Sequence, residues 1–360
     1  MRKDKFVDTL QIAWTIAWKD IQDALKNKNT RTNILIVMGL VVFFYWGSTP
    51  RPFDKRIDVA YYDEGNSSLR TNTAKMTDGY QFRFYETSSV YDLEGNLGWK
   101  QLGVVIPADF DQSLEQGREA ELTGYILWVF RSRVAELENK YSQKFSELLG
   151  KPVRVTIGEN IVIPRPETET TDMNTHILFV VFLIAVMVVP ILMMEEKQTK
   201  TMDALLISPA SIEQVILGKA LAGLFYILVC VGLVLVLNWT WFTSWGLALV
   251  GFTSSALLAI GLGLLIGTLA DQPQKVTLWA MPVLLIALLP TQLLQMEDVL
   301  SAGVINAMSW IPTVGLVKVL RFSLSSGAPL LQILSNLGLA LICTALVYGA
   351  IVWKVRRSDR

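Results

Sequence analysis

Long uncharged runs alternate with polar segments along this chain. The uncharged runs cover residues 32–50, 173–194, 220–270, 276–296, 299–317 and 322–353. The core of a lipid bilayer is about 30 Å thick, so a helix needs about 20 apolar residues to cross it. Several runs of this length predict an α-helical polytopic membrane protein rather than a large soluble core.

The run 220–270 is long enough for two spans and a tight turn. Residues 238–245 contain three tryptophans, which is typical of the aromatic belt at a membrane surface. We therefore expect the turn between the two spans in this stretch.

The polar segment 51–172 has the patterns of a folded α+β domain inserted after the first span. Residues 57–61, 81–85 and 153–157 alternate like half-buried strands, and 103–106 form a short apolar run. A helical stripe follows from Val134, Leu137, Tyr141, Phe145 and Leu148.

Residues 1–31 are predicted to form an amphipathic helix. Its apolar positions recur at helical spacing: Phe6, Leu10, Ala13, Trp14, Ala17, Ile21 and Leu25. Lysines and acids occupy the other face, so this helix can lie in the plane of the membrane interface beside the first span.

Basic residues near the span ends set the expected orientation. Residues 1–31 and the tail 354–360 are rich in Lys and Arg, which places both termini in the cytoplasm and requires an even number of spans. We predict six spans, at 32–50, 174–194, 219–238, 246–270, 276–295 and 330–353. The domain at 51–172 then lies outside, and 173–353 contains the last five spans, with a cytoplasmic loop at 195–219.

The uncharged window 299–317 would break this even count if it crossed the membrane. It contains Gly303, Asn306 and Pro312 and is flanked by charges. We predict a re-entrant outer segment within 297–325, because irregular backbone is tolerated at membrane depth where protein surrounds it.

Composition excludes several functional classes. Lysine plus arginine and aspartate plus glutamate both number 32, so the formal net charge is zero and no nucleic-acid partner is expected. The sequence has one histidine, and both cysteines lie inside uncharged runs. We therefore expect no Cys/His zinc site. No Walker A motif, catalytic constellation or charge inside the predicted spans is found, so we expect no enzyme, no metal and no cofactor bound by this chain.

The predicted span 246–270 carries a small residue at every fourth position. Small residues let helices approach closely in lipid, and this row serves either packing within the chain or contact with a second subunit. The row consists of Gly251, Ser255, Ala259, Gly263 and Gly267.

The charged segment 195–219 interrupts two membrane runs and is longer than a passive connector requires. Ser208-Pro209 fits a helix start, with serine as N-cap and proline in the first turn. Leu205 and Leu206 give an apolar face to a short preceding helix at 201–207. We expect two short helices broken at the proline.

This segment resembles the permease subunits of ABC-2-type ABC transporters, in the subgroup with a large extracytoplasmic domain between spans one and two. The matching positions are Glu196, Lys197, Thr201, Asp203, Leu205, Leu206, Pro209, Gly218 and Lys219. Three positions depart from the family pattern: Gln198, Lys200 and Asp203. Lys19-Asp20 in the first helix, and Trp310 and Pro312 followed by Lys318 and Arg321, are similar to the family's connecting helix and outer re-entrant segment.

The resemblance implies a half-transporter in the plasma (inner) membrane. A second permease subunit, identical or paralogous, would complete the pathway, and separate ABC ATPase subunits would bind ATP and Mg. The short helix at 201–207 would be the coupling helix, and the nine matching residues would form the ATPase-coupling site of an exporter. Two alternatives stay open: a membrane sensor, and a mechanical or regulatory ABC-type assembly that does not pump. Lipid-like molecules, drugs, peptides, polysaccharides and sodium remain candidate substrates.

Overall fold

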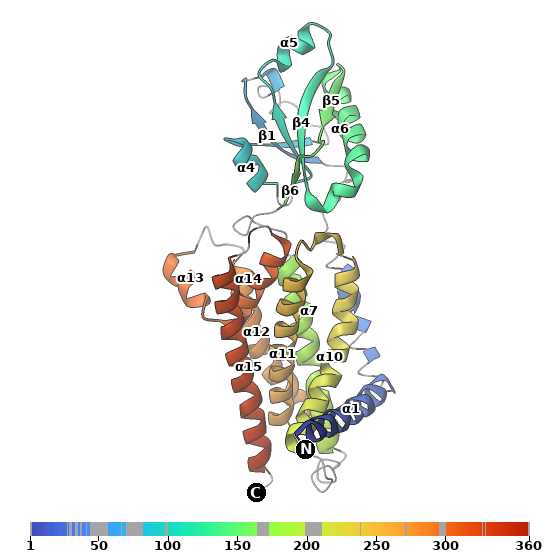
Figure 1. The fold of residues 1–360 in the computed structure, drawn as a ribbon, viewed down its shortest axis with the longest axis vertical. Coiled ribbons are helices and arrows are strands. Elements are labelled where there is room, and N and C mark those ends of the chain that lie inside the picture. The colour runs from blue at the N-terminus through green and yellow to red at the C-terminus, as the bar shows by residue number, and fades with distance from the viewer. Residues whose placement is uncertain are drawn as a thin grey trace.

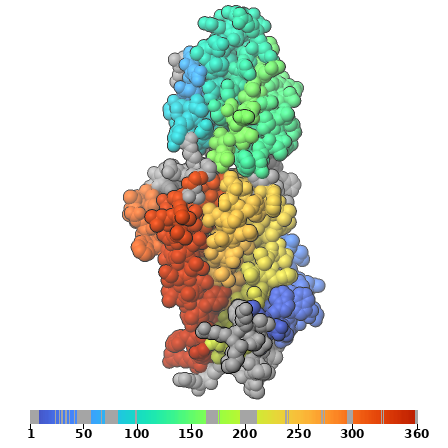
Figure 2. Space-filling model, viewed as in Figure 1, coloured from blue at the N-terminus to red at the C-terminus, as the bar shows by residue number. Residues whose placement is uncertain are grey.

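The computed structural model has two parts stacked along its long axis, a sheet domain and a helical bundle (Figures 1 and 2). It describes residues 2–26, 57–65, 67–69, 82–97, 100–163, 173–198, 211–237, 239–270, 272–294, 300–325, 327 and 329–358, and isolated residues between 28 and 43. We call the end of the bundle next to the sheet domain the domain end, and the opposite end the far end. Helix α1 (Arg2–Lys26) and the last turns of α15 (Leu330–Ser358) both lie at the far end (Figure 1).

A mixed sheet in the order β2-β1-β3-β4-β5 forms the centre of the sheet domain. Its strands are β1 (Ile57–Asp63), β2 (Phe82–Glu86), β3 (Leu102–Ile106), β4 (Ala120–Leu127) and β5 (Val153–Thr156), while the short β6 (Ile161–Val162) pairs with β4. β1 runs parallel to both β2 and β3, whereas β3 and β4 are antiparallel. The predicted strands are confirmed as strands, and β4 and the short β6 are additional ones.

The helical segments beside the sheet include α4 (Val90–Gly95), α5 (Phe110–Glu115), the 3-10 helix η1 (Trp128–Arg133) and α6 (Val134–Leu149). The predicted stripe buries Leu137, Tyr141 and Phe145 of α6 completely. Phe145 contacts Phe82 of β2 with ring centroids 5.2 Å apart. Alternating strand residues and one helical stripe thus build a separate core for this domain.

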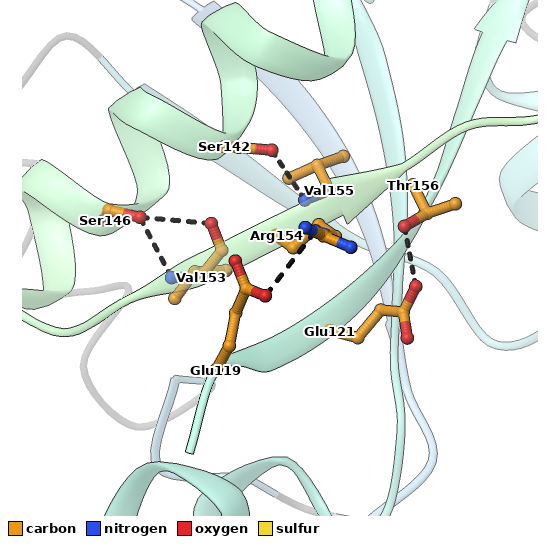
Figure 3. A network of polar contacts seen from close by, with 8 residues as sticks. All are labelled: Glu119, Glu121, Ser142, Ser146, Val153, Arg154, Val155 and Thr156. Atoms are coloured by element: carbon orange, nitrogen blue, oxygen red, sulfur yellow. Dashed lines mark hydrogen bonds and ion pairs between the residues drawn. The ribbon is translucent and has the colours of Figure 1, made fainter. Parts of the chain in front are cut away.

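Two serines of α6 form hydrogen bonds with backbone N–H and C=O groups of the edge strand β5 (Figure 3). Ser146 Oγ accepts from Val153 N–H at 2.9 Å and donates to Val153 O at 3.0 Å, and Ser142 Oγ accepts from Val155 N–H at 2.8 Å. An uncovered strand edge invites pairing with other chains. Helix α6 therefore covers the edge of β5 that faces away from β4.

The bundle consists of α7 (Met173–Met187), α8 (Val189–Gln198), α10 (Ile212–Leu237), α11 (Trp245–Leu269), α12 (Pro273–Leu293) and α15, with the shorter α13 (Ala302–Met308) and α14 (Pro312–Leu324). In the described part of the chain, five candidate membrane spans are long and apolar enough, and a sixth is counted if the bent pair α13–α14 is one span. These five match the last five predicted spans. The first, at 32–50, falls largely outside the described residues.

The bent pair α13–α14 enters and leaves the bundle at the domain end. The two helices meet at 93°. Thr313 Oγ1, at the start of α14, donates to Ala287 O of α12 at 2.6 Å, about two turns inside the end of that helix. At the other end of α14, Ser323 O accepts from the backbone of Thr243 and Ser244, in the turn before α11. This geometry fits either a re-entrant segment, as predicted, or a broken span.

The small residues of α11 pack against other helices of the same chain. A Cβ added at Gly251 would lie 3.0 Å from Val319 of α14, and one at Gly263 would lie 2.2 Å from Ala185 O of α7. One at Gly267 would lie 2.8 Å from Pro190 O of α8. Ser255 and Ala259, between them, are buried too. The row therefore lets α11 sit in the middle of the bundle.

Candidate functional site: a junction of α1, α8 and α10

Helix α1 divides its apolar residues between two faces. Ala13, Ala17 and Ile21 are buried and belong to the face that packs against α10. Trp14 and Trp18 are 57% and 50% exposed and stack with ring centroids 6.3 Å apart. Exposed tryptophans on a helix beside a membrane bundle are typical of the bilayer interface. The predicted single stripe is thus divided between a buried face against α10 and an exposed face that carries both tryptophans.

Gly218 allows α1 and α10 to cross in close contact. A Cβ at this position would lie 2.8 Å from Ile16 Cβ and 2.9 Å from Ala13 O. Contacts below 3.0 Å are not tolerated without a shift of the neighbouring atoms, and here one neighbour is backbone. A larger residue would separate the two helices.

Lys219 joins three helices from a completely buried position. Its Nζ donates to Asp20 Oδ2 of α1 at 3.2 Å and to Leu192 O of α8 at 2.7 Å. The relative exposure of the Lys219 side chain is 0%, and that of Asp20 is 10%. Removing two charges from water costs several kcal/mol for each ion, which only close pairing and further hydrogen bonds offset. Separation of α1 from α8 and α10 would therefore leave a buried charge without its partner.

Tyr226 adds a second polar contact between α10 and the same part of α1. Its hydroxyl lies 3.1 Å from Ile21 O and 3.4 Å from Asp20 O, and it is buried. Tyr226 is seven residues after Lys219, so both side chains lie on nearly the same face of α10. We call Asp20, Lys219, Tyr226 and the Leu192 carbonyl the junction.

The sequence prediction of charge-free spans is wrong at the start of α10. This helix begins at Ile212 rather than near 219, so Lys219 lies two turns inside it. The helix start predicted at Ser208-Pro209 lies outside the described residues. Ser211 is the observed cap: its Oγ accepts from Gln214 N–H at 3.3 Å, and Gln214 Oε1 accepts from Ser211 N–H at 2.8 Å. This is a reciprocal capping box, with glutamine in the third helical position.

Two further contacts tie the first turn of α10 to its surroundings. Gln214 Nε2 lies 3.3 Å from Thr9 Oγ1 of α1. Glu213 forms an ion pair with Arg356 in the last turns of α15. The junction side of α10 is therefore attached to both terminal helices of the chain.

The structure places some of the predicted ATPase-coupling residues and leaves others undescribed. Gly218 and Lys219 belong to the contact between α10 and α1. Glu196 and Lys197 lie in the last turn of α8, where only the backbone is described. Five more lie outside the described residues: Thr201, Asp203, Leu205, Leu206 and Pro209. Asp20, Tyr226 and Leu192 O complete the junction, and of these only Asp20 had a sequence signal, through the similarity of Lys19-Asp20 to the family's connecting helix.

The three predicted residues of the outer segment all lie on α14. Pro312 is its first residue, and Lys318 and Arg321 follow on one face of the helix, both partly exposed. They are at the domain end, away from the junction.

Comparison with known proteins identifies the family of this chain. The family model of the ABC-2 family transporter protein matches residues 34–354. The probable multidrug ABC transporter permease YbhR of Escherichia coli K12 is 26% identical over 295 residues, which cover 76% of this chain and 80% of that protein. YbhR of E. coli O157:H7 gives the same values. No solved structure gives a significant match. The match covers most of the chain, including the helical bundle and the segment 195–219. This protein therefore belongs to the ABC-2 transporter family.

Proposed function

We propose that this chain is the permease subunit of an ATP-driven exporter and that separate ABC ATPase subunits drive it through the loop at 195–219. The observation that carries the proposal is the junction, because it joins α8 and α10, the two helices that contain the ends of this segment. Leu192 lies six residues before Gln198, the last residue of α8, and Lys219 lies seven residues after Ile212, the first residue of α10. Asp20 connects both to α1.

Movement of the loop would reach the bundle through this junction. Packed helices joined by a buried ion pair move together, because separating them exposes an uncompensated charge. A push on residues 199–210 therefore displaces the ends of α8 and α10 together with α1. Gly263 and Gly267 bring α11 against α7 and α8, so the displacement continues into the centre of the bundle.

The proposed orientation has the far end in the cytoplasm. Both terminal helices end there, with Lys354, Arg356 and Arg357 in the last turns of α15. An excess of Lys and Arg near span ends is typical of the cytoplasmic side. The sheet domain then lies outside the plasma membrane, and the junction lies where an ATPase subunit can reach the loop.

A second permease subunit is part of the proposal. Helices α12 and α15 expose large apolar residues along their length, including Leu285, Ile286, Leu341, Ile342 and Leu346, each at least 50% exposed. Lipid or a second subunit must cover these faces. The relative is named a probable multidrug permease, and on this ground we propose drugs as the class of cargo.

Charge reversal in the loop tests the coupling. The chain is co-reconstituted in vesicles with its ATPase subunit, and the permease-dependent rate of ATP hydrolysis is measured. We expect Glu196→Lys and Asp203→Lys to lower this rate while the subunit still inserts into the membrane. Glu115→Lys, on an exposed face of α5 in the sheet domain, is the matched control and should leave the rate unchanged. Wild-type rates in both loop variants would refute the role of the loop.

A further inference from the structure

A short 3-10 helix of the sheet domain contacts the bundle. Cα atoms of η1 lie within 8 Å of Cα atoms of η2 (Trp239–Trp241), the 3-10 helix in the turn between α10 and α11. Figures 1 and 2 show the sheet domain directly above the domain end of the bundle. Whether this contact can transmit movement depends on how firmly each of the two segments is held on its own side.

The segment η1 is a fixed part of the sheet domain. It directly follows β4 and directly precedes α6, so both of its ends are held by the sheet domain. Phe130 is buried in the core of that domain. The Arg131 guanidinium lies 3.9 Å from the centroid of the Trp128 ring, and its Nη1 donates to Trp128 O at 3.1 Å. A displacement of η1 therefore requires a displacement of the whole domain.

The turn that contains η2 is packed by aromatic rings. The ring centroid of Trp245, the first residue of α11, lies 4.3 Å from that of Trp239 and 4.8 Å from that of Phe242. Aromatic pairs at such distances stabilise a structure beyond the area that they bury. These rings therefore join η2 to the first turn of α11.

Hydrogen bonds continue from this turn to the end of α14. Thr243 Oγ1 lies 2.9 Å from Ser323 O and 3.0 Å from Ser325 O. The backbone N–H groups of Thr243 and Ser244 both donate to Ser323 O at 3.0 Å. Ser323 and Ser325 are buried, and a buried carbonyl that loses its hydrogen bonds costs free energy. The turn and the end of α14 are thus held together.

We propose that η1 and η2 form a docking contact that ties the position of the sheet domain to the turn 239–245 and, through Thr243, to the end of α14. Coupling between two parts of a protein acts in both directions. A molecule that displaces the sheet domain would therefore act on α14, and a movement of α14 would displace the sheet domain. The contact requires neither ATP nor transport, so it goes beyond the proposed export function and can be tested in the chain alone.

Cysteine cross-linking tests the docking contact. Both native cysteines are replaced by alanine in the full chain, which is placed in lipid nanodiscs. Val129→Cys or Ser132→Cys in η1 is combined with Thr240→Cys in η2, and a short thiol-reactive cross-linker is added. The control replaces Thr240→Cys by Ser301→Cys, at the start of α13 on the other side of the domain end (Figure 1). At least one pair between η1 and η2 should react about tenfold faster than its control, because docking raises the effective concentration of the second thiol.

Hydrogen exchange of the cross-linked chain tests the connection to α14. Fixing the sheet domain should slow the exchange of residues 239–245 and of residues 320–325. Thr243→Val should reverse the slowing in 320–325 by about fivefold, the effect of one lost neutral hydrogen bond, and keep it in the turn. Thr253→Val is the matched control, because the Thr253 hydroxyl donates to Leu249 O within α11; this variant should keep the slowing in both segments.

Two outcomes would overturn the proposal. Equal cross-linking of η1 to Thr240→Cys and to Ser301→Cys would mean that the sheet domain is not docked on the turn. Slower exchange in 239–245 with unchanged exchange in 320–325 would mean that the coupling ends at the turn. Both measurements are made without an ATPase subunit, so neither depends on the loop at 195–219. Size-exclusion chromatography of each variant confirms that the compared proteins are folded.

Discussion

Replacing Lys219 by methionine should detach α1 from the bundle. The substitution keeps a long apolar side chain but removes the ammonium group that Asp20 Oδ2 contacts at 3.2 Å. Asp20 would then be an almost buried carboxylate without this cation. Removing one partner of a buried ion pair costs about 3–5 kcal/mol.

This magnitude converts into a rate of hydrogen exchange. If α1 opens locally and exchange is limited by the open population, about 1.4 kcal/mol corresponds to a tenfold change. The amides of residues 10–25 should therefore exchange on the order of 10²- to 10³-fold faster in Lys219→Met than in the wild type. Amides of α6, in the sheet domain, are the internal reference and should be unaffected.

The double variant separates charge from packing. Asp20→Leu alone leaves the Lys219 ammonium buried with the Leu192 carbonyl at 2.7 Å, so it should also accelerate exchange. Asp20→Leu/Lys219→Met removes both charges and should recover much of the protection, because an apolar pair of similar volume replaces a buried ion pair at little cost. Equal exchange of α1 in the wild type and both single variants would refute the junction as a constraint. Additive effects in the double variant would refute the electrostatic explanation.

Other contacts give further predictions. Gly218→Ala should accelerate exchange of α1 at a cost of about 1–3 kcal/mol, because its Cβ would lie 2.8 Å from Ile16 Cβ; unchanged exchange would contradict this packing. Gly263→Ala, with its Cβ 2.2 Å from a backbone oxygen, should lower the yield of folded protein on size-exclusion chromatography, whereas Gly232→Ala, with nothing within 4 Å, should not. Burial raises the pKa of Tyr141 well above its ordinary value, so the unfolded chain releases this proton near pH 10 while the folded domain keeps it. The stability of the sheet domain should therefore decrease as the pH rises above about 10, and Tyr141→Phe should weaken this dependence in urea unfolding followed by circular dichroism; an identical pH slope would argue against Tyr141 as its source.

Periodic signals explain what could be predicted from sequence. Five spans, four strands and α6 were expected where they occur, because each buries a regular pattern of apolar residues. Strand β4 was missed although Ala120, Leu122 and Ile126 alternate with Glu121 and Thr123, the same signal that identified its neighbours. A re-entrant segment at 297–325 was predicted from the required even number of spans; the structure shows a 93° bend between α13 and α14, and the re-entrant path stays a prediction.

The junction could not be predicted, because its partners are distant in sequence. Lys219 and Asp20 are separated by 199 positions, and no local pattern identifies a lysine that will be paired inside a bundle. Gly218 and Lys219 were selected through the family resemblance as coupling residues. Their observed contacts are with α1 and α8, so any role in coupling acts through these helices, and this role remains a prediction.

Hydrogen exchange of the complex with its ATPase subunit tests the central claim most directly. The full assembly is compared without nucleotide and after trapping with ATP and vanadate. Our account predicts altered exchange at residues 195–219 and, together with it, in α1, because the junction links the loop to that helix. The Asp20→Leu/Lys219→Met variant should retain the change at the loop and lose the change in α1. Identical exchange of the wild-type loop and α1 in both nucleotide states would contradict a permease driven through this segment.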